Sequence, residues 1–107
     1  MRTIIALIAT LLLSVGSVSA FDHVITKNNQ FGCVSRGDYE ELISIAGSRD
    51  EEGFTNVMAS QLVRGRCILL KRGQPVTFVD SAMFAGLVKI RIRGTGITVW
   101  TVREAID

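Results

Sequence analysis

Few side chains in this chain of 107 residues could take part in chemistry, and their spacing forms no catalytic pattern. His23 is the single histidine, and it lies in a polar stretch where a solvated side chain is expected. Nucleophilic catalysis by serine or cysteine would need a better placed base. The acidic groups at residues 40–41 and 50–52 fall on expected helix surfaces or caps, and no glycine-rich loop leads from a strand into a helix. We therefore expect no enzyme activity, no metal site and no cofactor, and the alternative of a small hydrolase has little support.

The two cysteines, Cys33 and Cys67, fit a structural disulfide better than a reactive site. They lack a C-x-x-C spacing and have no neighbouring histidine, which leaves a reactive thiol pair as the weaker alternative. An exported protein with two cysteines most simply forms one disulfide. Closing a loop of this length stabilises a fold by roughly 3–4 kcal/mol on the chain-entropy model.

The first 20 residues have the pattern of a secretory signal peptide. Arg2 gives a positive start, residues 4–13 are apolar, and Val18-Ser19-Ala20 provides small residues for cleavage. The apolar run is shorter than the roughly 20 residues that span a membrane, and an uncleaved anchor is the alternative. We expect a signal peptide over 1–20 and a periplasmic or secreted product with no stable membrane span.

The part that would remain after cleavage, residues 21–107, is nearly neutral. The chain has 12 lysines and arginines and 10 aspartates and glutamates, so loss of Arg2 leaves a net charge of about +1. A charge this small gives no reason to expect a nucleic-acid partner. We predict a flexible polar leader over residues 21–32 and a single mature domain over residues 33–107.

Two amphipathic helices are predicted over residues 35–65. Both begin with a cap pattern, at Ser35 and at Ser48, and a glycine follows each helix. Their apolar positions recur with the spacing of one helical face: Tyr39, Leu42, Ile43 and Ala46, then Phe54, Val57, Met58 and Leu62. Because the link is short, the helices should form a hairpin and bring Cys33 close to Cys67.

Residues 67–102 read as four short strands joined by turns, followed by a possible helical turn. The clearest strand is 87–93, in which apolar and basic side chains should face opposite sides: Val88, Ile90 and Ile92, against Lys89, Arg91 and Arg93. The expected class is α+β, with an N-terminal helical hairpin that is disulfide-linked to a small antiparallel β-barrel or curled sheet.

The order of residue types in these strands resembles bacterial SH3-like domains. A lysine–glycine turn occupies 71–73, residues 86–91 read Gly-Leu-Val-Lys-Ile-Arg, and a glycine turn at 94–96 leads to Trp100. Roughly a third of the chain carries this resemblance, and Val99 stands where the family usually has glycine. The layout of helices and then strands is also similar to small exported bacterial proteins of unknown function. The resemblance implies binding of cell-wall peptides or protein partners rather than catalysis.

The candidate binding surface consists of Lys89, Arg91, Arg93 and Trp100. A hairpin loop of two or four residues would place Trp100 beside Lys89 or Arg91, where a cation and an aromatic ring could bind a ligand. A loop of three residues would turn Trp100 inward, and two glycines permit either. Trp100 could instead cover the end of the barrel or pack against the helices. The basic row could bind an anion or be a solvated sheet face.

A strand is expected over residues 76–79 and a loop over residues 80–86. Met83 and Phe84 form the apolar middle of this loop, which could be an exposed tip for a partner or a plug for the barrel. Together these residues predict a non-enzymatic exported binding module that contacts an envelope protein or peptidoglycan. The alternative is a small inhibitor or immunity-type protein that blocks an envelope enzyme or an uptake step.

Overall fold

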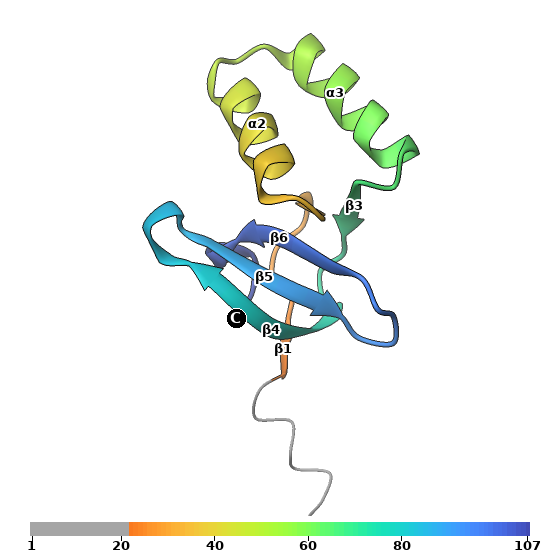
Figure 1. The fold of residues 1–107 in the computed structure, drawn as a ribbon, viewed down its shortest axis with the longest axis vertical. Helices are drawn as coiled ribbons and strands as arrows, with labels where there is room; N and C mark the ends of the chain where they lie inside the picture. The colour runs from red at the N-terminus through yellow and green to blue at the C-terminus, as the bar shows by residue number, and fades with distance from the viewer. Residues whose placement is uncertain (1–21) are drawn as a thin grey trace, which may run out of the picture.

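The computed structural model describes residues 22–107, so the predicted signal peptide lies outside the described residues. This part of the chain is α+β, as predicted, with two helices and one antiparallel sheet of six strands (Figure 1). In chain order the elements are β1 Asp22–Val24, β2 Gln30–Cys33, α2 Arg36–Gly47, α3 Glu51–Val63, β3 Cys67–Leu70, β4 Pro75–Ala82, β5 Leu87–Ile92 and β6 Thr98–Val102. Two short 3₁₀ turns, η2 Met83–Ala85 and η3 Arg103–Ala105, follow β4 and β6.

The strands follow the order β1-β4-β5-β6-β2-β3, and β4, β5 and β6 form a continuous meander. The two helices connect β2 to β3, and we call residues 36–63 the helical insert. Figure 1 shows the insert at one end of the described structure and β1, beside β4, at the other end. The helices therefore do not form the N-terminal part of the domain, because two strands precede them. An SH3-like barrel stays a prediction.

The segment 21–32, predicted as a flexible leader, is instead structured wherever it is described. β1 pairs with β4 and β2 pairs with β3. Ile25, just after β1, is fully buried, and Asn29 adopts a positive φ of 59° in the turn before β2. The prediction was wrong because the polar run at 27–30 is only the link between two short strands.

Both predicted helices are confirmed, with two corrections. Ile43 and Ala46, expected on the apolar face of the first helix, are exposed, and the second cap is a different residue. The Ser35 hydroxyl accepts a hydrogen bond from the Asp38 N–H at 3.4 Å, as expected for an N-cap. For α3 the cap is Asp50, whose carboxylate accepts from the Gly53 N–H at 2.9 Å, whereas Ser48 ends α2. Arg49, with a φ of 65°, makes the turn between the helices.

Three contacts join the two ends of the helical insert to each other. The Cys33–Cys67 disulfide is present, and its cysteines are direct partners across β2 and β3. Next to it the Val34 N–H donates to the Arg66 carbonyl at 2.8 Å. Arg66 Nε also lies 3.1 Å from the Asp38 carboxylate at the start of α2. The disulfide thus closes the base of the insert, as the sequence predicted.

Two hydrophobic cores lie on opposite faces of the meander. The sheet core consists of Ile25, Leu70, Val76, Val88, Ile90, Ile92, Val99 and Ile106. The insert core, between the helices and the sheet, contains Cys33, Tyr39, Leu42, Met58, Cys67 and Leu87. Trp100 and Val102 pack against the insert core. β5 and β6 therefore each contribute neighbouring residues to the two cores, Leu87 and Val88 in β5 and Val99 and Trp100 in β6.

Tyr39 is the buried polar anchor of α2. Its ring lies 4.9 Å from that of Phe31 between centroids, and its hydroxyl is hydrogen-bonded to the Thr101 side chain and the Val102 backbone. Only 2 % of the residue is exposed. Burial, which disfavours the phenolate, raises the pKa of Tyr39 above its ordinary value of 10.0.

Tyr39 gives the fold an alkaline limit. Because the folded-state pKa is raised, its contribution to stability is present below pH 10 and is lost as the pH rises through the folded pKa. We expect the free energy of unfolding to fall above pH 10 in the native protein. The Tyr39→Phe variant should start about 1 kcal/mol less stable and lack this part of the decline. Urea unfolding from pH 8 to 11 checks this, and parallel declines would contradict it.

Candidate binding surface on the sheet

The β5–β6 hairpin decides where Trp100 lies. Residues 93–96 form its loop, which is even in length, and the Ile92 N–H donates to the Ile97 carbonyl at 2.9 Å. Gly94 adopts a positive φ of 84° within this loop. The resulting register pairs Lys89 with Trp100, as the even loop predicts.

The alternation predicted for β5 is confirmed. Its apolar residues Val88, Ile90 and Ile92 are all buried in the sheet core. On the opposite face Arg91 is exposed and Lys89 is half-buried. Arg93 lies just beyond β5, and its N–H donates to the Pro75 carbonyl at 3.2 Å.

Trp100 is half-buried, and it combines two of the roles considered for it. It packs against the insert core, which makes it part of the contact between helices and sheet. Its ring also lies 5.9 Å from the Lys89 ammonium, within reach of a cation–π interaction. The indole is therefore fixed by packing and carries a cation beside it.

The face that carries Trp100 changes character with distance from the helices. Cross-strand partners define its successive rows: Ala82-Leu87-Val102, then Asp80-Lys89-Trp100, then Thr77-Arg91-Thr98. The first row is covered by the insert core, the second is at its margin, and Arg91 in the third is exposed. We call Lys89, Arg91 and Trp100 the sheet surface. It combines cations with an aromatic ring that packing holds in place.

The turn η2 lies beyond the end of β4, which is longer than the sequence indicated. β4 continues to Ala82 across an irregularity in register between Phe78 and Asp80, so part of the expected loop is strand. Met83 begins the turn, and Phe84 in its middle is fully exposed. Phe84 therefore does not plug the sheet, and the interpretation as an exposed tip is the one that fits.

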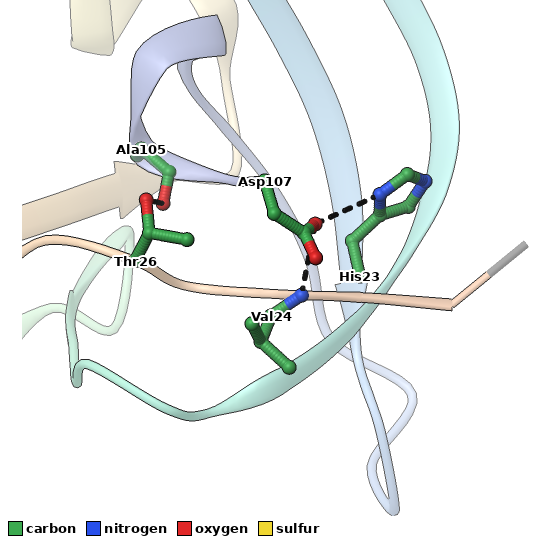
Figure 2. Close-up of polar contacts among 5 residues, drawn as sticks. All are labelled: His23, Val24, Thr26, Ala105 and Asp107. Carbon is green, nitrogen blue, oxygen red and sulfur yellow. Dashed lines mark hydrogen bonds and ion pairs between the residues drawn. The ribbon is translucent and has the colours of Figure 1, made fainter.

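His23 was expected to be solvated in a tail and is instead part of a contact between the chain ends. Figure 2 shows the Asp107 carboxylate facing both His23 and the Val24 backbone. His23 Nδ1 and Asp107 Oδ1 are 3.0 Å apart, and the Val24 N–H donates to the same oxygen at 3.3 Å. Beside them the Thr26 hydroxyl donates to the Ala105 carbonyl at 3.4 Å. In this solvent-exposed position the pair is expected to add little stability.

The chemistry-bearing side chains do not converge in the described part of the chain. Within residues 22–107 no three His, Cys, Asp or Glu side chains are grouped so that they could hold a metal ion. Both cysteines, Cys33 and Cys67, are joined in the disulfide and carry no free thiol. None of the helices over this range is long and apolar enough to cross a membrane.

Within residues 22–107 the structure shows hollows that the sequence did not indicate. One of about 290 Å³ lies between the helices and is lined by Ala46, Arg49, Asp50, Glu51, Phe54 and Thr55. The other, of about 430 Å³, is lined by Phe78, Ser81, Gly86, Leu87, Val88 and Arg103. We call the second the hairpin hollow. No local signal could have found it, because the fold alone brings Arg103 to the β4–β5 hairpin.

Comparison of the chain with protein-family models, with curated proteins and with solved structures finds no match.

Proposed function

We propose that this chain is a non-enzymatic binding module, exported to the periplasm or secreted, that contacts an envelope protein or peptidoglycan. The observation that carries the proposal is the sheet surface. There the Lys89 ammonium lies 5.9 Å from the half-buried Trp100 ring, and the exposed Arg91 follows in the next row. A rigid aromatic ring beside cations suits ligands with acidic groups and planar or apolar parts. The disulfide supports an oxidising compartment.

We further propose that the sheet closes into a small SH3-like barrel. Its strand order runs from β1 to β3, yet Ile25 beside β1 and Leu70 of β3 share the sheet core. Residues from both ends of a strand order meet in one core when a sheet curls. An isolated bridge between Ile25 and Ile106 adds a further pairing beside β1.

A small inhibitor or immunity-type protein is the second candidate, and Phe84 is the observation that favours it. This aromatic side chain is fully exposed on a short turn that projects beyond the sheet. Exposed aromatic anchors that enter a pocket of the partner commonly dominate the energy of protein interfaces. An inhibitor of this kind would form a tight one-to-one complex with a single enzyme.

The test is retention of a partner from envelope extract, together with co-sedimentation with isolated peptidoglycan. The Lys89→Gln/Arg91→Gln variant removes two charges from the sheet surface, and we expect it to lower affinity by about tenfold. Lys71→Gln/Arg72→Gln removes two exposed charges from the β3–β4 turn and serves as the matched control. Trp100→Ala is avoided because it would also take a ring from the insert core.

The outcomes separate the candidates. Loss of binding in the sheet-surface variant alone supports the binding module. An equal loss of affinity in both variants would indicate only general charge attraction and would contradict the proposed site. A partner that is retained by both variants but lost from Phe84→Ser would move the interface to η2, and a single inhibited enzyme would then favour the inhibitor.

A further inference from the structure

The hairpin hollow lies where β4 ends and β5 begins, and its volume of about 430 Å³ is in the range of small-ligand sites. Its lining comes from three parts of the chain: the end of β4, the start of β5, and η3. The Arg103 N–H donates to the Gly86 carbonyl at 3.0 Å, which attaches η3 to the hairpin. The hollow is thus bounded by regular elements that are hydrogen-bonded to one another.

The lining is mostly apolar. Leu87 and Val88 are buried, with exposed fractions of 5 % and 1 %, and both also belong to hydrophobic cores. Phe78 is 41 % exposed and also lines the hollow, and its ring meets that of His23 edge-on at 6.5 Å between centroids. An exposed aromatic ring next to a buried aliphatic floor favours an apolar group of a ligand over water.

Two polar side chains complete the lining, and both have capacity for a ligand. Among the described side chains, Arg103 forms no ion pair and the Ser81 hydroxyl forms no hydrogen bond. Arg103 is exposed, and a guanidinium can donate two parallel hydrogen bonds to a carboxylate. The acidic side chains near the hollow do not occupy the guanidinium: Asp80 accepts from the Ser81 N–H at 2.7 Å, and Glu104, which follows Arg103, forms no ion pair among the described side chains.

From this combination we propose that the hairpin hollow binds a carboxylate that carries an apolar side group. Arg103 would hold the carboxylate in a bidentate pair, the Ser81 hydroxyl would donate to it, and the apolar group would lie against Phe78 and Val88. Such a ligand is either the C-terminal residue of a peptide or a small apolar organic acid. The two sources share the chemistry that the hollow recognises.

This site is separate from the sheet surface, and the inference does not rest on the function proposed for that surface. Ser81 and Val88 are cross-strand partners, and Val88 belongs to the sheet core. Because side chains alternate along a strand, they face away from Lys89 and Trp100. Loss of one site should leave the other intact.

The test is an NMR titration of the oxidised protein with N-acetyl-leucine and, as the neutral control, N-acetyl-leucinamide. For a ligand this small we expect a dissociation constant on the order of 1 mM, with amide shifts at Ser81, Gly86, Val88 and Arg103. The amide ligand should bind at least about tenfold more weakly, since it lacks the charge that pairs with the guanidinium. Titration with 4-methylpentanoate distinguishes the two sources of ligand. Tighter binding of 4-methylpentanoate than of N-acetyl-leucine would indicate a free acid, and weaker binding would indicate a peptide terminus.

Variants locate the effect. Arg103→Gln should weaken N-acetyl-leucine binding by at least about tenfold. Arg103→Lys should weaken it less, because lysine keeps the positive charge but cannot donate the two parallel hydrogen bonds of a guanidinium. Arg72→Gln, an exposed arginine in another turn, should leave binding unchanged. Equal affinity for acid and amide, unchanged binding by Arg103→Gln, or an absence of shifts at 10-fold the expected dissociation constant would each overturn the proposal.

Discussion

Gly32→Ala is expected to lower the free energy of unfolding by about 3 kcal/mol, through overpacking. Gly32 lies in β2, next to Cys33, where β2 pairs with β6. A Cβ at this position would stand 2.5 Å from Val99 Cγ2 and 3.2 Å from the Trp100 carbonyl oxygen. Val99 is fully buried in the sheet core, and a backbone oxygen cannot turn aside. Neither neighbour can yield without disturbing the sheet.

Urea unfolding measures this effect, and Gly96→Ala is its matched control. A Cβ at Gly96 meets nothing within 4 Å, so this variant should unfold at nearly the native midpoint. The cost of Gly32→Ala should also shrink in a Val99→Ala background, which removes the closest atom. Equal costs in both backgrounds would show that the approach of β2 to β6 is not the cause.

Removal of the disulfide by Cys33→Ala/Cys67→Ala should cost roughly 3–4 kcal/mol. The bond joins residues that are 34 positions apart and closes the base of the helical insert. Both cysteines are buried in the insert core, so alanine would also leave small cavities there. Hydrogen exchange should show the helices opening more readily than the meander.

The native protein in reductant separates the two contributions, because it loses the bond and keeps both sulfur atoms. We expect the reduced protein to be less stable than the oxidised one, and the double-alanine variant to be less stable still. If the oxidised and reduced proteins unfold at the same urea concentration, the link contributes nothing to stability and the chain-entropy argument fails here.

Much of the fold could be predicted because its patterns are local. The two helical spans, the Ser35 cap and the alternation over residues 87–93 each depend on side chains only a few positions apart. The same locality explains the errors. β1 has only three residues and depends on β4, which lies more than fifty positions away, so its own composition carried no signal.

The candidate sites divide in the same way. The pairing of Lys89 with Trp100 could be derived from a hairpin loop of even length, which is a local property. The hairpin hollow depends on the meander and on η3, which attaches Arg103 to Gly86 across the fold. Sequence periodicity reports which face a residue occupies, but it does not report which distant residues share that face.

The contact between His23 and Asp107 joins residues 84 positions apart, and it has a consequence for the order of folding. A chain that is synthesised from its N-terminus holds β1 long before residues 105–107 can hydrogen-bond beside it. Ile25 and Ile106, which pack in the same core, are likewise the first and last members of that core to appear. Such non-local pairing slows folding and makes it a late, concerted event. We expect C-terminal truncations that remove Ile106 to leave β1 detached and the sheet core open.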